Sequence, residues 1–190
     1  MTNLDLNTLD AFVLDTPVGK IKLFADKTNL YKIEFAEVTE EALTGYPKVI
    51  NFAVMYLQAS KTPNFLLKQA IKEIAAYFDQ GARTFDISIN YEYTGTPLQQ
   101  ATWEILRTIP YGVTVTLNDV VNALKAENPE EVQKAIDLNP LPLIIPSHRA
   151  VAGMIGLTPD MGGYSGGRWR KEWLLNHERV AGGKQKRDII

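Results

Sequence analysis

The feature that most constrains this fold is a polar stretch, residues 90–95, at which the spacing of apolar residues changes from alternating to helical. Directly after it, Thr96 can cap a helix, Pro97 suits the first helical position, where no backbone N–H is needed, and Gln99 completes a capping box. A strong helix start after a polar segment that ends on glycine is typical of a domain boundary. We therefore expect an α+β chain with two domains, residues 1–93 and 94–180, and a flexible tail over residues 181–190.

The first domain is predicted to be an antiparallel sheet with one helix. Short runs rich in β-branched and aromatic residues, separated by turn-forming residues, predict the strands Phe12–Leu14, Ile21–Phe24 and Tyr31–Phe35. From Asn64 to Gln80 the apolar residues recur at helical spacing, and Gly81 provides the stop. Alternating apolar residues over 85–89 predict a further strand.

The second domain is predicted to be mainly helical. The helix that begins at Pro97 has an apolar face that includes Trp103. A second helix is expected from Leu117 to Lys125 and a third from Pro129 to Leu138. Two short helices joined by a tight connection predict a helix-turn-helix, a motif that commonly binds DNA.

Composition argues against several classes of site. The chain holds 20 basic and 22 acidic residues, a formal net charge of −2, so any affinity for nucleic acid must come from a local patch. It has no cysteine and only two histidines, in separate segments, which argues against a disulfide framework and against a metal site. No segment predicts a secretion signal or a membrane span, so we expect a cytoplasmic protein without membrane contact.

Four segments of the second half share their order and spacing with a known family. They are Gly95–Trp103, Ile109–Gly112, Asn139–Arg149, and Gly163–Gly167 followed by Lys171–Glu178. In this order they resemble the C-terminal domain of O6-alkylguanine-DNA alkyltransferases, proteins that move an alkyl group from damaged guanine onto their own cysteine. The Thr16–Gly19 turn and the run from Tyr77 to Asp86 resemble the first domain of that family more loosely.

The resemblance implies a fold and a partner. It implies a ribonuclease-H-like first domain and a second domain whose helix-turn-helix enters the minor groove of DNA. The expected partner is double-stranded DNA that contains alkylated guanine. The resemblance further implies a monomer that needs no cofactor.

The chain departs from the family in the loop Pro146–Arg149, because Ser147 occupies the position of the nucleophilic cysteine. The resemblance implies that His148 activates this position through a water, that Glu178 orients His148, and that Asn139 braces the loop. It also implies contacts to the alkylated base from three further residues, Tyr164, Ser165 and Ala150.

Serine is a poor substitute in this reaction. Removing an alkyl group from an exocyclic oxygen is a displacement at saturated carbon, which favours a soft, polarizable anion, and a cysteine thiol with a pKa of about 8.5 can supply one. A serine hydroxyl assisted by one histidine ionises far less. Serine works in acyl transfer because an oxyanion is stabilised as the proton leaves, whereas an alkyl carbon develops no such oxyanion. The sequence therefore predicts a protein that does not transfer alkyl groups.

A serine hydrolase is the rival interpretation of Ser147, His148 and Glu178. Adjacent side chains on an extended segment point to opposite faces, so a direct hydrogen bond from Ser147 to His148 is awkward. The Gly-x-Ser-x-Gly turn of many hydrolases is also missing around Ser147. The sequence disfavours this chemistry.

The predicted helix-turn-helix lacks features that the family uses on DNA. Leu117 stands where the family has a tyrosine that presses on the DNA backbone, and the next helix lacks the arginine that fills the space of an extruded base. The one basic residue that this helix offers for DNA contact is Lys134. The net charge of the helix is −2, because three residues are acidic: Glu130, Glu131 and Asp137. Such a face is repelled by phosphate, although Ile136 could still insert apolar bulk into a groove.

Basic residues gather near the end of the chain, at Arg168, Arg170, Lys171 and Arg179. They could contact phosphate. A solvated helix face explains the same pattern, and the sequence slightly favours that interpretation.

Three functions stay open. The first is a non-catalytic homologue that recognises alkylated DNA, the second a repair methyltransferase inactivated by an engineered change of cysteine to serine, and the third a scaffold that binds a protein or small molecule instead of DNA. Ser147, Leu117 and the missing arginine depart from the family together, whereas an engineered change would alter one position. The sequence therefore favours the first function over the second.

Overall fold

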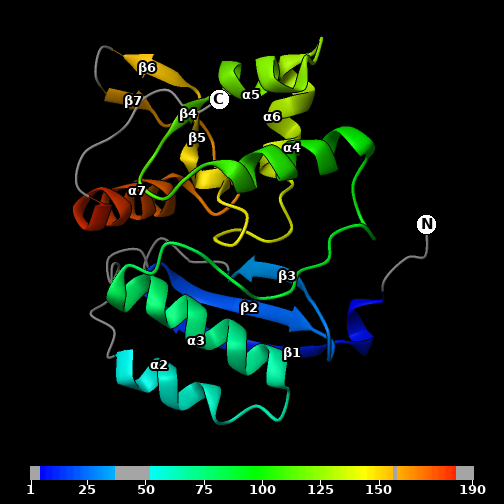
Figure 1. Ribbon diagram of the computed structural model, residues 1–190, viewed down its shortest axis with the longest axis vertical. Coiled ribbons are helices and arrows are strands. Elements are labelled where there is room, and N and C mark those ends of the chain that lie inside the picture. Colours follow the sequence, from blue (N-terminus) through cyan, green and yellow to red (C-terminus); the bar gives the residue numbers. More distant parts are fainter. Residues whose placement is uncertain (1–4, 37–51, 156–157, 183–190) are drawn as a thin grey trace. The chain divides into compact units, whose positions relative to one another are not determined.

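The computed structural model describes residues 5–36, 52–155 and 158–182, and the chain divides into two compact units, Met1–Thr94 and Gly95–Ile190. The first unit is an antiparallel sheet with helices, and the second is mainly helical (Figure 1). The predicted α+β class is confirmed.

Three strands form the predicted antiparallel meander of the first unit. They are β1 (Asp10–Thr16), β2 (Gly19–Ala25) and β3 (Leu30–Phe35), in that order in the sheet. A short 3₁₀ turn, η1 (Leu6–Thr8), precedes them. Leu14 pairs with Ile21, and Leu23 pairs with Ile33. These four side chains are buried, so the register places the apolar residues of each strand in one core.

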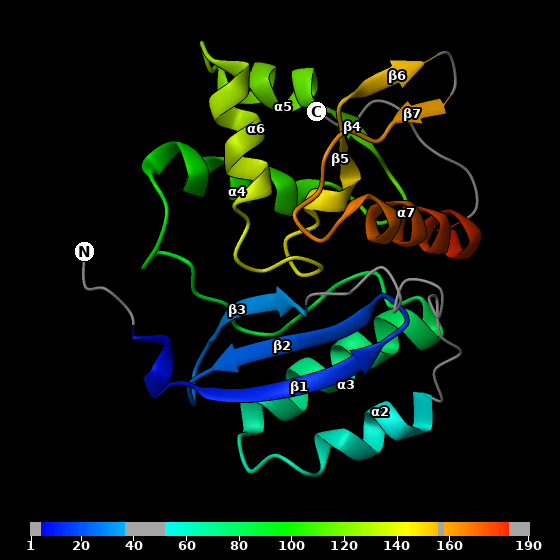
Figure 2. The ribbon, with the colours of Figure 1, turned by 180° about the vertical axis from the view of Figure 1, so that it is seen from behind.

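Helix α3 (Phe65–Gln80) covers one face of this sheet: it lies in front of the strands in Figure 1 and behind them in Figure 2. Asn64 caps its first turn by accepting a hydrogen bond from Leu67 N–H, and Gly81 ends it in the left-handed conformation. A second helix, α2 (Phe52–Ala59), packs beside α3 and β1. The sequence did not predict α2, because its residues are apolar on nearly every side.

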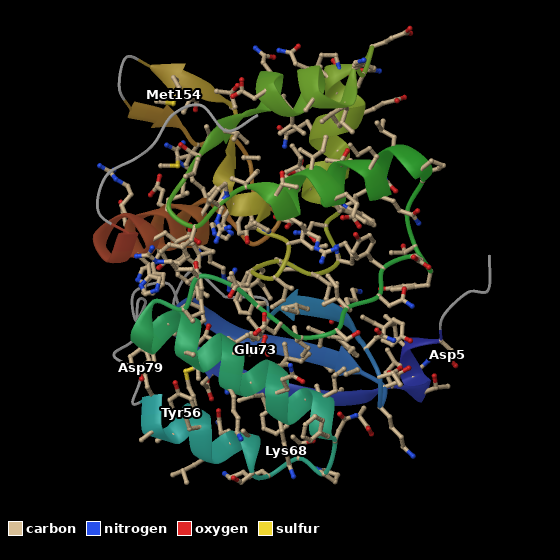
Figure 3. All side chains as sticks on the ribbon, viewed as in Figure 1. Asp5, Tyr56, Lys68, Glu73, Asp79 and Met154 are labelled. Atoms are coloured by element: carbon tan, nitrogen blue, oxygen red, sulfur yellow. The ribbon has the colours of Figure 1, made fainter. Side chains whose placement is uncertain are left out.

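The predicted strand over residues 85–89 is wrong. Only Ile89 pairs, in a single parallel bridge to Leu30. The backbone N–H groups of Asp86 and Ile87 donate to the carboxylate of Glu73 on α3, labelled in Figure 3, at 2.9 and 3.1 Å. A side chain therefore takes the donors that a strand would use in a ladder.

The second unit is built on three helices that pack on one another: α4 (Pro97–Thr108), α5 (Leu117–Leu124) and α6 (Pro129–Asp137). The predicted capping box is present, because Thr96 and Gln99 exchange side-chain and backbone hydrogen bonds. Gly95 has a φ of +81°, and a Cβ there would lie 2.6 Å from the Trp103 ring. Trp103 is buried and donates from Nε1 to the Ala135 carbonyl at 2.8 Å, which ties α4 to α6.

After α6 the chain continues through the loop that ends at Ser147 and then, by way of short strands, to the last helix. Short strands β4 (Val115–Thr116) and β5 (Ala150–Val151) pair in parallel, and the 3₁₀ turn η2 (Ser147–Arg149) directly precedes β5. A hairpin of β6 (Gly153–Ile155) and β7 (Thr158–Asp160) follows. Helix α7 (Arg168–Gly182) packs against η2.

Helix α7 includes residues 181 and 182 of the predicted flexible tail, which are therefore helical. The remainder of that predicted tail, residues 183–190, lies outside the described residues. Among the described helices, none is long and apolar enough to cross a membrane.

Candidate functional site

The loop between α6 and η2 is braced by one side chain. Asn139 donates from Nδ2 to the Ile145 carbonyl at 2.7 Å and accepts from the Leu141 N–H at 2.9 Å. Within this loop, Leu143 adopts a φ of +78°, which is costly for a residue with a branched side chain. The bonds of Asn139 therefore hold a backbone conformation that the loop would not favour by itself.

Ser147 lies at the end of this braced loop with 1% of its surface exposed. Its Oγ accepts a hydrogen bond from Asn139 Nδ2 at 3.0 Å. Burial raises the pKa of the Tyr164 phenol, and the charge of Arg170 and a hydrogen bond with the Ser147 hydroxyl oppose that rise. The serine hydroxyl thus sits in a closed environment in which an amide donor already occupies one of its lone pairs.

His148 is fully buried and contacts Glu178 through Nε2, at 2.8 Å from Oε1. Burial lowers the pKa of His148, although the Glu178 carboxylate opposes this. A neutral ring must carry its proton on Nε2, since a carboxylate can only accept. The other nitrogen, Nδ1, is buried and finds no hydrogen-bond partner among the described residues.

Glu178 is surrounded by donors. Arg149 contributes Nε at 3.0 Å from Oε2 and Nη2 at 3.0 Å from Oε1, and the backbone N–H of Gly112 lies 2.9 Å from Oε2. Burial alone would raise the pKa of Glu178, but the charges and hydrogen bonds of His148 and Arg149 hold it well below its usual range. The negative charge of Glu178 is therefore matched by a permanently charged guanidinium, and His148 can stay neutral.

Arg149 also donates from Nη1 to the Ile109 carbonyl at 2.6 Å. Its guanidinium thus joins the end of α4 to η2, while Glu178 joins both to α7. This ion pair was missed by sequence reasoning, which treated Arg149 as a neighbour of His148. The signal available in the sequence was an arginine between the apolar runs 140–146 and 150–151, where a charge needs a partner.

The structure brings together four of the predicted residues, Ser147, His148, Glu178 and Asn139. It does not join Ser147 to His148, because the free nitrogen of the histidine has no partner and the bonded one faces Glu178. A hydrolase needs a base within hydrogen-bonding reach of the nucleophile, so this geometry lacks the first link of a triad. Among the described residues there is also no cluster of acidic and histidine side chains suited to a metal ion.

The predicted base contacts differ in accessibility. Ser165 is exposed, Tyr164 is partly buried, and the Ala150 side chain is buried within β5. Of the predicted DNA contacts, Leu117 begins α5 and is partly buried, while Lys134 is exposed on α6.

Ile136, predicted as a wedge for a DNA groove, is only 4% exposed. With Val132 and Ala135 it forms the apolar face by which α6 packs in the helical core. The wedge prediction is therefore corrected: helical spacing turns this residue inward, toward α4 and α5.

The basic cluster at the end of the chain is likewise not one surface. Arg168 is exposed, but Arg170 and Lys171 are 5% and 2% exposed. Neither a phosphate-binding patch nor a solvated helix face describes these two buried cations.

Two family models match the chain. Residues 97–180 match the DNA binding domain of 6-O-methylguanine DNA methyltransferase, and residues 12–91 match its ribonuclease-like domain. The chain belongs to the 6-O-methylguanine DNA methyltransferase family. The two matches together span most of the described residues of both units.

Individual members of this family are similar over nearly the whole chain. A methylated-DNA–protein-cysteine methyltransferase of Mycolicibacterium paratuberculosis is 33% identical over 171 residues, covering 87% of this chain and 90% of that protein. A probable methylated-DNA–protein-cysteine methyltransferase of Acanthamoeba polyphaga mimivirus is 29% identical over 170 residues, covering 88% of this chain and 95% of that protein. A crystal structure of Mycobacterium tuberculosis OGT in complex with DNA has a TM-score of 0.68 and 28% identity, covering 89% of this chain and 92% of that one.

Proposed function

We propose that this chain is a non-catalytic member of the DNA repair family, which binds duplex DNA containing alkylated guanine and does not accept the alkyl group. Membership of the family supports a role in DNA repair. The related proteins are named for transfer to a protein cysteine, and one related structure is a complex with DNA. This chain has no cysteine to take part in such a transfer.

The observation that carries the proposal is the state of Ser147. Its hydroxyl accepts from Asn139 and has no hydrogen bond to His148, the nearest candidate base in sequence. A hydroxyl in this position lacks both the low pKa of a thiol and a base to remove its proton. The histidine and glutamate of the site therefore have no nucleophile to activate.

Binding without transfer is supported by the site that surrounds the serine. Asn139 holds the loop, and Tyr164 lies near the Ser147 hydroxyl, so a shaped and largely buried environment is retained. The exposed acidic residues of α6, Glu130 and Glu131, oppose attraction to the DNA backbone. We therefore expect weak binding with little dependence on salt, and a preference for damage that comes from the buried site.

The test compares a duplex with one O6-methylguanine and the same duplex undamaged, over several salt concentrations. We expect the alkylated duplex to bind about tenfold more tightly, equivalent to about 1.4 kcal/mol. Equal affinity for both duplexes would contradict the proposal and favour a scaffold with another partner.

A cysteine variant separates the proposal from an inactivated repair enzyme. We expect Ser147→Cys to transfer methyl groups slowly, because the helix-turn-helix still repels DNA. Ser165→Cys is the matched control, since it places a thiol at an exposed position next to Tyr164 in sequence, whereas position 147 is buried. Rapid transfer by Ser147→Cys would instead indicate a chain that is complete except for its cysteine.

A further inference from the structure

Two buried cations at the start of α7 point toward one short segment. Lys171 donates from Nζ to the Gly163 carbonyl at 3.1 Å, and Arg170 donates from Nη1 to the Gly166 carbonyl at 2.5 Å. Both acceptors belong to the segment Gly163–Gly167, which leads into α7. The two side chains therefore fold back and fasten the segment to the first turn of the helix.

Two effects make these positions unfavourable for a positive charge. The N-terminal end of a helix carries a partial positive charge, which repels lysine and arginine. Burial also lowers the pKa of Lys171 to about 8, although Asp137 and Asp160 oppose that shift. The bonds of Lys171 and Arg170 to the two carbonyls are among the interactions that offset these costs.

The backbone of the same segment is also constrained. Gly167 N–H donates to the Tyr164 carbonyl at 2.8 Å, which closes a turn, and Gly167 has a φ of +88°, a conformation that favours glycine. The Gly167 carbonyl in turn accepts from the Arg170 N–H at 3.1 Å, in the first turn of α7. Tyr164 thus lies inside a turn that is held at both ends by α7.

Tyr164 is the residue through which this arrangement reaches the site. Its phenol oxygen is buried, and its pKa responds to Arg170 and to the Ser147 hydroxyl. Arg170 therefore holds the segment through Gly166 and also acts electrostatically on the phenol. Lys171 in turn acts electrostatically on His148.

We propose that Lys171 and Arg170 are positioning residues, which hold the segment Gly163–Gly167 so that Tyr164 lies against Ser147 and the site discriminates alkylated from unmodified guanine. The discrimination rests on the proposed function, whereas the clamping of the segment does not. The two buried cations act on the base through Tyr164, and they do not contact phosphate.

The test uses Lys171→Met and Arg170→Met in the full chain, with Arg168→Met as the matched control. Arg168 lies in the same turn of α7 and pairs with Glu172, with 69% of its side chain exposed. All three variants remove one positive charge, and methionine is of similar length without placing a new polar group in the interior. Circular dichroism verifies folding before any comparison is made.

The first readout is amide hydrogen exchange of the segment without DNA. We expect Lys171→Met and Arg170→Met to speed exchange at Gly167 by about tenfold or more, the effect of losing one charge-assisted hydrogen bond. Exchange in α4 should stay unchanged, as should the segment in Arg168→Met. Unchanged exchange at Gly167 in the two folded variants would overturn the clamp.

The second readout is affinity for the alkylated and the undamaged duplex. Loss of the preference, with affinity for undamaged DNA and its salt dependence unchanged, supports positioning, and Lys171→Arg should recover part of the preference by restoring a donor. An equal loss for both duplexes with a shallower salt slope would overturn it in favour of phosphate contacts. If the unmodified protein shows no preference, the proposed function fails, while the exchange result still decides whether the clamp exists.

Discussion

The buried network around Glu178 and the exposed face of α6 belong to the same unit but differ in what holds their residues in place. Glu178, His148 and Arg149 are each bonded to one another or to the backbone and are almost entirely buried. Glu130 and Glu131 on α6 are exposed. A change in the first region disturbs folding, whereas a change in the second alters mainly the surface charge.

Under the proposed function, this difference explains how the buried network can persist in a chain that does not transfer alkyl groups. The network joins α4, η2 and α7, so it contributes to stability whether or not a nucleophile stands at position 147. Its geometry is therefore no measure of catalytic activity. Under the proposed function, attraction to the DNA backbone depends instead on surface residues, which can change at little cost in stability.

The largest expected effect is on the network itself. Glu178→Gln leaves the Arg149 guanidinium buried without its counter-charge, so we expect the free energy of unfolding to fall by about 3–5 kcal/mol. Urea unfolding followed by tryptophan fluorescence measures this in the second unit, which contains all three tryptophans.

The matched control is Glu172→Gln, which breaks the exposed pair with Arg168 on the same helix. We expect it to change stability by less than about 0.5 kcal/mol. If Glu178→Gln and Glu172→Gln lowered the free energy of unfolding by similar amounts, the buried and exposed residues would not differ in the way described.

A smaller effect is expected from His148 as pH falls. Its pKa is lowered in the folded protein, so below the unfolded value of 6.5 the unfolded chain takes up the proton first and stability declines. The slope for one proton is at most about 1.4 kcal/mol per pH unit. Urea unfolding at several pH values between about 5 and about 7.5 should show this decline in the free energy of unfolding.

His148→Gln removes the titrating group and keeps a donor in the place of Nε2. We expect the decline in stability at about pH 6 to disappear in this variant. The pKa of Glu178 is also lowered, so its contribution is lost only as pH falls below its unfolded value of 4.5. If His148→Gln kept the full decline in stability at pH values above those at which Glu178 contributes, His148 would not be the source of that decline.

The smallest effect is expected on the surface of α6. Replacing Glu130 and Glu131 by lysine should increase affinity for undamaged DNA and steepen the dependence of log K on log salt by about 2, if both side chains reach phosphate. Asp86→Lys with Glu92→Lys is the control, because it makes the same change in charge on the first unit. An equal change in slope for both pairs would mean that net charge matters and the α6 face does not.

Local signals predicted much of the fold. Asn64 and Gly81 marked the ends of α3, and Thr96 with Gln99 marked the start of α4, because caps are decided by residues a few positions apart. The strand predicted at residues 85–89 failed because its donors go to Glu73 on another element. No pattern of alternation records such a contact.

In the candidate site, too, the sequence predicted what a local motif marks and missed what depends on packing. The loop that holds Ser147 and His148 was found from its motif, and so was Glu178. The salt bridge of Arg149 with Glu178 spans 29 positions, and the burial of Lys171 depends on how α7 packs, so neither leaves a local signal. Ile136 was misplaced for a related reason, since only the packed structure shows which face of α6 turns inward.

The most direct test of the account is intact mass spectrometry of the unmodified protein after incubation with a duplex that contains O6-methylguanine, followed by mapping of the peptide that holds Ser147. Ser147→Cys, treated in the same way, serves as the positive control for transfer. We expect the unmodified chain to keep its mass while part of the cysteine variant gains one methyl group. A stable methyl group on Ser147 of the unmodified chain would contradict the account.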